Sequence, residues 1–289
     1  MKRIKSGWQL TKKSWGILSD EPGLIKFPIV GGVIALLIAI VLIAPGLYFL
    51  EADPVALGVV MVAVGTYLSA FVVYYFAVAL AHNADRRMQG EQVEFKDGMA
   101  LAGSRMSAIA GWAFIATVVM TVIRAIQERF GIAGAILGGL AGAAWGVLSF
   151  LAVPVIAIEG TGPISTLKRC GNLVKSGWGE QITGTIAIGG IVFLLGFLPA
   201  VLFIIAGVFI FSTTAAGGGI LIAFGIVVLV VAALIQQALS TIFGVALYRW
   251  VSDKQAVGGF TAEEMQSGVR TKKGSLGGPG MPPTSASTV

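Results

Sequence analysis

The stretch from Ile132 to Glu159 places the strongest constraint on what this chain can fold into. It is long and apolar enough to cross a bilayer as a helix, and only its last residue carries a charge. Within it, glycine recurs at every fourth position, at Gly134, Gly138, Gly142 and Gly146. On a helix these glycines form a stripe without side chains, against which a neighbouring helix backbone can pack closely. The stretch therefore predicts a membrane-spanning helix that packs through its glycines.

The composition extends this prediction to the whole chain. Only 12% of the 289 residues are charged and 56% are hydrophobic, whereas soluble domains carry about 25% charged residues. Six apolar stretches are long enough to span a membrane, at residues 27–50, 55–82, 108–127, 132–158, 182–211 and 220–250. They predict an all-α bundle of three transmembrane hairpins in an integral membrane domain of residues 1–251. Residues 252–289, rich in Gly, Pro and Ser, are predicted to be a disordered tail because they cannot bury a core.

Each hairpin is preceded by an amphipathic segment that is too polar to span a membrane. These segments cover residues 3–19, about 94–107 and about 163–178. Such helices lie in the membrane surface, with Trp at the boundary and Lys toward anionic headgroups. The residues expected at the interface are Trp8, Lys12, Lys13, Trp15, Trp178 and, after the last span, Trp250. Three segments in matching positions favour a threefold internal repeat, with Trp15, Met106 and Trp178 in register.

The distribution of basic residues predicts the orientation of the chain. All of the 20 Lys and Arg residues except Arg124 and Arg129 lie on one side of the predicted spans. Because basic loops of multi-pass membrane proteins face the cytoplasm, both termini are predicted to be cytoplasmic. The net charge of +6 fits anionic lipid better than nucleic acid, because the basic residues flank the spans.

Two segments of the chain resemble a known family. The opening GWQLTKKSWGIL, followed by Phe27 and Pro28, resembles the N-terminus of uncharacterised six-span integral membrane proteins that are common in actinobacteria. The block from Val153 to Trp178 is similar to that family's second signature and to the membrane domain of bacterial glycerophosphodiester phosphodiesterases. The resemblance implies a multi-pass protein of the bacterial cell (inner) membrane. It implies no agreed activity and carries no catalytic residue across.

Few side chains offer catalytic chemistry. His82 is the only histidine, and Asp85 follows one helical turn later, but two such groups do not complete a metal site. Glu159 ends the fourth span, where we expect it to cap the next helix or to pair with Lys168 or Arg169; a proton relay is the alternative. The sequence therefore predicts no enzyme activity, no metal and no cofactor, with a catalytic or metal role for His82 and Asp85 as the alternative.

Polar residues within a span are the remaining candidates for function. The sixth span carries Gln236, Gln237, Ser240 and Thr241, which can hydrogen-bond to a neighbouring helix or line a path for a neutral solute. Two hypotheses follow. The first is a non-enzymatic scaffold or assembly factor that binds membrane lipid, expected to be anionic, and a membrane-protein partner or a second copy of itself. The second is a transporter or channel for a small or lipidic substrate.

Overall fold

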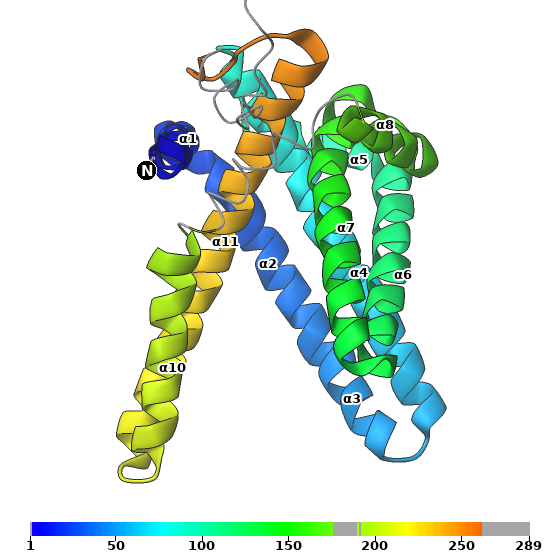
Figure 1. The fold of residues 1–289 in the computed structure, drawn as a ribbon, viewed down its shortest axis with the longest axis vertical. Helices are drawn as coiled ribbons and strands as arrows, with labels where there is room; N and C mark the ends of the chain where they lie inside the picture. Colours follow the sequence, from blue (N-terminus) through cyan, green and yellow to red (C-terminus); the bar gives the residue numbers. More distant parts are fainter. Residues whose placement is uncertain (1, 176–189, 191, 262–289) are drawn as a thin grey trace, which may run out of the picture.

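A computed structural model describes residues 2–175, 190 and 192–261. Within these ranges every regular element is a helix, which confirms the predicted all-α class. Six helices are long and apolar enough to cross a membrane, and Figure 1 shows them as three hairpins. They are Pro22–Glu51, made of η1 (Pro22–Ile25), α2 (Lys26–Ile38), η2 (Ala39–Ile43) and α3 (Ala44–Glu51); α4 (Val55–Met88); α6 (Met106–Arg129); α7 (Gly131–Glu159); Phe193–Phe211, made of η4 (Phe193–Phe197) and α10 (Leu198–Phe211); and α11 (Ala215–Asp253). Residues 182–189 and 191 of the predicted fifth span lie outside the described residues.

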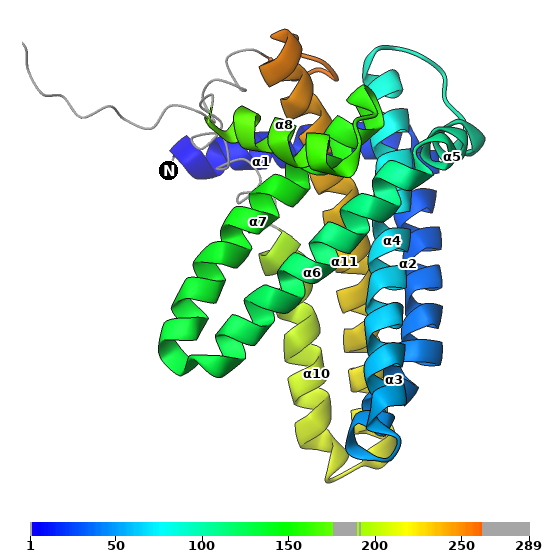
Figure 2. The same cartoon turned by 90° about the vertical axis from the view of Figure 1, so that its right-hand side faces the viewer.

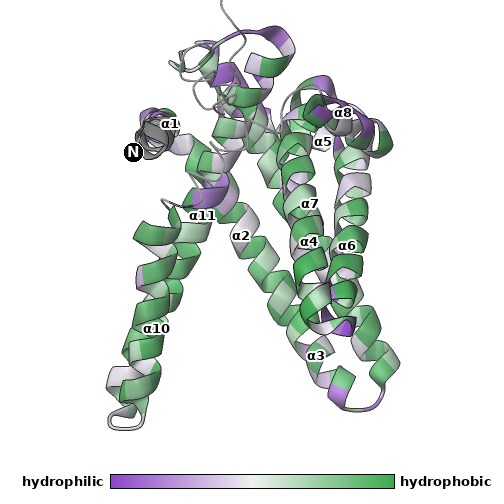
Figure 3. Cartoon of the chain, in the orientation of Figure 1, coloured by the Kyte–Doolittle hydropathy of each residue, from purple (hydrophilic) through white to green (hydrophobic). Residues whose placement is uncertain are grey.

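Three further helices lie across one end of the spans. They are α1 (Lys2–Asp20), α5 (Phe95–Ser104) and α8 (Pro163–Lys175), and they correspond to the three amphipathic segments. Figures 1 and 2 place all three at the same end of the molecule, where α4 and α11 also finish. Figure 3 shows hydrophilic residues gathered at this end and hydrophobic residues along the spans. We call this end, made of α1, α5, α8 and the last turns of α4 and α11, the platform end.

The second arms of the three hairpins form the core of the fold. α4, α7 and α11 pack against one another, and each carries a run of consecutive buried residues near the platform end: 76–81, 151–157 and 241–248. A helix that is buried on all sides rather than along one stripe lies inside a bundle. Two of these runs also resemble one another in sequence, with FAVAL at 76–80 and FGVAL at 243–247. The second arms of the first and third hairpins are therefore alike in sequence and in burial, which supports the predicted internal repeat for these two hairpins.

In the first hairpin and in the third, the two arms pack against each other through the same kind of glycine contact. In the first, a Cβ added at Gly58 would lie 2.7 Å from the Gly46 carbonyl oxygen of the other arm. In the third, a Cβ added at Gly218 would lie 2.6 Å from the Gly207 carbonyl oxygen. Since real Cβ atoms do not approach a carbonyl this closely, only glycine allows these backbones to touch. The glycines that close these two hairpins were not singled out by the sequence analysis.

The glycine stripe of α7 is used only in part. Gly134 and Gly138 are buried and lie against Ile126 and Gln127 of α6, where an added Cβ would clash. At Gly142 and Gly146, by contrast, an added Cβ would meet nothing within 4 Å. The reason is that α6 and α7 diverge from their turn toward the platform end, as Figure 2 shows. Within the described residues, the expected continuous packing groove therefore extends over only half of the stripe.

The platform helices dock through small or apolar side chains spaced four residues apart. The buried pairs are Ser14 and Leu18 in α1, Gly98 and Ala102 in α5, and Thr166 and Cys170 in α8. These pairs align the three platform helices in a register that differs from the predicted one, in which Trp15, Met106 and Trp178 were equivalent. Met106 in fact begins the span α6 rather than ending α5. Shifts of four or seven residues keep the same helix face, so a face pattern alone cannot fix the register. Trp178 lies outside the described residues.

The predicted boundary of the disordered tail is wrong. α11 continues to Asp253, and the chain then reverses at Lys254, which has a φ of 57°. The segment that follows returns to the bundle and buries Phe260, which is only 4% exposed and packs edge-on to Phe243 with ring centroids 6.4 Å apart. An aromatic side chain gains about 2 kcal/mol or more from such burial, which favours this packed position of the segment. Residues 262–289 lie outside the described residues.

Candidate functional site

A buried ion pair joins the first and third hairpins at the platform end. Arg249 of α11 donates through Nε to Oδ1 of Asp85 and through Nη2 to Oδ2, each at 2.7 Å. The Asp85 side chain is 8% exposed and also accepts a hydrogen bond from Gln89 at 3.0 Å. Arg249 also donates through Nη1 to Oδ2 of Asp253 at 2.8 Å. Two parallel bonds from one guanidinium are the geometry that orients a carboxylate most tightly.

A second polar cluster adjoins the first, because Tyr248 and Arg249 are consecutive. The Tyr248 hydroxyl donates to Oε1 of Glu159, and the same oxygen accepts a bond from Arg169 Nε at 2.7 Å. The structure thus gives Glu159 one of its two expected partners and adds a tyrosine that the sequence analysis did not consider. The bond to Glu159 raises the pKa of Arg169. The last turn of α11 therefore holds both α4 and α7 in place.

The alternative role for His82 and Asp85 receives no geometric support. Both Asp85 oxygens are engaged by Arg249, and His82 is only half-buried in α4. Within the described ranges, no three His, Cys, Asp or Glu side chains are close enough together to hold a metal ion. The absence of enzyme activity stays a prediction.

The polar residues of the sixth span bond within their own helix. Gln236 Nε2 donates to Ser240 Oγ at 2.9 Å, and Thr241 Oγ1 donates to the Gln237 carbonyl at 2.9 Å. The expected hydrogen bonds to a neighbouring helix are not formed by these atoms. Among the described residues, Gln236 Oε1 is one of several buried polar atoms that have no partner; Ser69 Oγ on α4 and Ser149 Oγ on α7 are others.

The expected interface residues differ in their surroundings. Trp15 is 48% exposed and Lys12 is exposed on the same helix, whereas Lys13 Nζ donates to the Gly259 carbonyl at 2.7 Å. Trp250 is half-buried at the end of α11. The side chain of Trp8 lies outside what the structure describes. Lys13 therefore holds the returning C-terminal segment, a role that a charge pattern in the sequence does not reveal.

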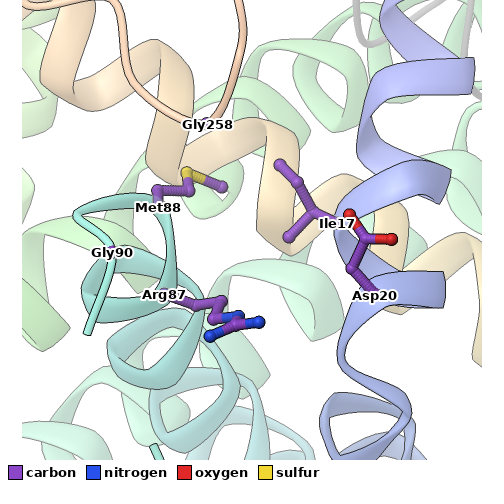
Figure 4. A pocket seen from close by; sticks show the side chains of 6 residues that line it. All are labelled: Ile17, Asp20, Arg87, Met88, Gly90 and Gly258. Atoms are coloured by element: carbon purple, nitrogen blue, oxygen red, sulfur yellow. The ribbon is translucent and has the colours of Figure 1, made fainter. Parts of the chain in front are cut away.

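A cavity of about 360 Å³ opens between α1, the end of α4 and the returning C-terminal segment. Its lining consists of Ile17, Asp20, Arg87, Met88, Gly90 and Gly258. Figure 4 shows Arg87 and Asp20 entering it from opposite sides. Arg87 also approaches Glu21, with Nε and Oε2 3.6 Å apart. The signal for this cavity in the sequence was two acidic residues where α1 ends, Asp20 and Glu21, and two arginines near the end of α4, Arg86 and Arg87. It was not recognised from the sequence.

Cys170 provides a test of how firmly α8 is docked. The thiol is buried, and burial together with the Glu159 charge raises its pKa to about 12. Because the thiolate is the reactive form, we expect alkylation at pH 8 to be about a thousandfold slower than for an unperturbed thiol with a pKa of about 8.5. The rate should rise about tenfold with each pH unit up to pH 12. Mass spectrometry of a Ser19→Cys variant, which adds an exposed thiol, would measure both rates in one molecule; equal rates would contradict the docking of α8.

These observations define the class of the protein: an all-α, multi-pass membrane protein with a polar layer at one end of its spans. The chain belongs to the family described as Family of unknown function (DUF6159), which matches residues 60–259. The match contains both ion-pair clusters and ends at Gly259, next to the cavity. No curated protein and no solved structure matches the chain. The resemblance to an uncharacterised membrane-protein family is confirmed at this level.

Proposed function

We propose that the protein is a non-enzymatic membrane scaffold that binds lipid headgroups through its platform end. One observation carries this proposal: three amphipathic helices lie at the same end of the spans, each held by a buried face. Each also turns at least one lysine outward, with Lys12 on α1, Lys96 on α5 and Lys168 on α8. Basic amphipathic helices bind anionic headgroups, with about 1 kcal/mol for each Lys or Arg near the surface.

The proposal includes where the protein lies and what it meets there. The basic platform end supports a cytoplasmic position for both termini in a bacterial inner membrane, and the predicted resemblance to the membrane domain of glycerophosphodiester phosphodiesterases fits such a location. The unused glycines of α7, Gly142 and Gly146, leave room for a helix of a partner protein or of a second copy. Nucleic acid and a cofactor are not part of the proposal.

Lipid retained during purification tests the proposal. We expect a Lys12→Gln, Lys168→Gln, Lys175→Gln variant to retain about tenfold less anionic lipid than the wild type after gentle extraction, because three charges leave the platform end. The control is Arg124→Gln with Arg129→Gln, which removes charge at the opposite end of α6. Lipid mass spectrometry would measure both. Equal retention in all three proteins would overturn lipid binding at the platform end.

Transport is the second candidate function, because the core arms contain buried polar atoms that have no hydrogen-bond partner among the residues that the structure describes. Ser69 on α4, Ser149 on α7 and Gln236 on α11 each have one. Transporters place such groups along their pathways. Flux of a neutral solute through vesicles that contain the purified protein, lost in a Gln236→Leu variant, would favour this function over the scaffold.

A further inference from the structure

The cavity between α1 and α4 carries a more specific inference, which rests on the proposed lipid binding. We propose that this cavity binds a phosphoethanolamine group, with Arg87 holding the phosphate and Asp20 and Glu21 holding the ammonium. The inference goes beyond attraction of anionic lipid to lysines, because it names one cavity and a ligand that carries both charges.

The first argument is the arrangement of charge. Arg87 and Asp20 line the same cavity from two different helices. The charges of the lining therefore balance, and a ligand with a single charge would leave one of the two side chains without a counter-charge. A zwitterion whose phosphate and ammonium are separated by two carbons can satisfy both.

The second argument is the availability of Arg87. The neighbouring Arg86 forms a hydrogen-bonded ion pair with Glu91, and Arg249 forms one with Asp85. Arg87 and Glu21, at 3.6 Å, are too far apart for a hydrogen bond, and their side chains remain 28% and 25% exposed. Within the part of the chain that the structure describes, the Arg87 guanidinium therefore keeps donors free for a phosphate, which it can hold through two bonds.

The third argument is the shape of the cavity. Its volume of about 360 Å³ lies near the lower end of the range of about 300–1,000 Å³ for small-ligand sites, so it suits a headgroup rather than a larger molecule. Gly258, with a φ of 65°, closes one side so tightly that an added Cβ would lie 2.8 Å from Met88 Cγ and 3.0 Å from Ile17 Cδ1. Met88 and Ile17 supply an apolar wall for the carbons of the ligand.

The returning C-terminal segment keeps this shape. Lys13 binds the Gly259 carbonyl, and Phe260 is inserted into the core beside Phe243. Both contacts fix Gly258 at the rim. The site is therefore composed of residues from three separate parts of the chain, which explains why no short motif marks it.

Native mass spectrometry of the full-length protein, after delipidation and addition of one lipid at a time, tests the proposal. We expect phosphatidylethanolamine to bind at least fivefold more tightly than phosphatidylcholine, whose quaternary ammonium has no N–H to donate to Asp20. It should also exceed phosphatidylglycerol, which has no ammonium. Arg87→Gln should weaken the binding of phosphatidylethanolamine at least fivefold, because the phosphate loses its guanidinium, whereas the control Arg86→Gln should leave it unchanged. An Asp20→Asn, Glu21→Gln variant should reverse the order in favour of phosphatidylglycerol, because the repelling carboxylates are gone.

The same assay distinguishes the two sources of the ligand. Binding of free phosphoethanolamine that depends on Arg87, without binding of the lipid, would support the site and identify a soluble ligand. Equal binding of the three lipids, or an Arg87→Gln variant that unfolds at the wild-type temperature and binds phosphatidylethanolamine as tightly as the wild type, would overturn the site. Neither result would affect lipid binding by the platform lysines, which the Lys12, Lys168 and Lys175 variant tests separately.

Discussion

Replacing Asp85 by Ala is expected to destabilise the protein by about 3–5 kcal/mol. The substitution removes the carboxylate that Arg249 holds through two hydrogen bonds and leaves the guanidinium with Asp253 alone, and breaking a buried ion pair costs about that much. The Asp85 side chain is 8% exposed and that of Arg249 is 21% exposed, so water can screen only part of the loss. Reversible unfolding in mixed micelles that contain increasing SDS would measure the change.

Two comparisons show whether this loss comes from the buried charge. Glu91→Ala breaks the Arg86–Glu91 pair, whose side chains are 47% and 43% exposed, and should cost less than about 1 kcal/mol. Replacing Asp85 by Leu and Arg249 by Met together removes both charges and should be less destabilising than Asp85→Ala alone. If Glu91→Ala and Asp85→Ala had equal effects, the pair would not hold the hairpins together.

The Asp85–Arg249 ion pair shows how far the fold can be predicted from the sequence. The six spans were predictable because charge is confined to their ends, which is a property of each segment alone. The partner of Asp85 was not predictable, because it depends on which helix ends meet in the fold. Hydrophobic patterns carry no information about that. The same holds for Glu159: its pairing with Arg169 was foreseen because the two are close in sequence, whereas the bond from Tyr248 crosses between hairpins.

The other differences between the predictions and the structure can also be traced to particular residues. The tail boundary was misplaced because composition averages over a segment, and Phe260 is a single aromatic residue among glycines. The register predicted for the three amphipathic helices was wrong because successive turns of a helix present similar faces. The similar FAVAL and FGVAL segments of the core arms were the readable signal of the repeat. Comparing the second arms, rather than the surface helices, would have aligned the first and third hairpins.

Replacing Gly218 by Leu should destabilise the protein by about 3 kcal/mol. Its Cβ alone would lie 2.5 Å from Phe211 Cα and 2.6 Å from the Gly207 carbonyl oxygen, and both are backbone atoms that no rotamer change can move. The arms of the third hairpin must therefore separate, which forfeits their packing. Unfolding in SDS-containing micelles would again measure the loss.

Gly219 provides the matched control, because it is the next residue of the same helix and an added Cβ there would meet nothing within 4 Å. Gly219→Leu should be neutral or slightly stabilising, since a leucine suits a helix better than glycine. The internal repeat predicts a further result. The Gly58→Leu variant, changed at the corresponding contact with Gly46, should lose about as much stability as the Gly218→Leu variant. A large loss at Gly218 with none at Gly58 would mean that the two hairpins resemble each other in sequence but are not held together by the same contact.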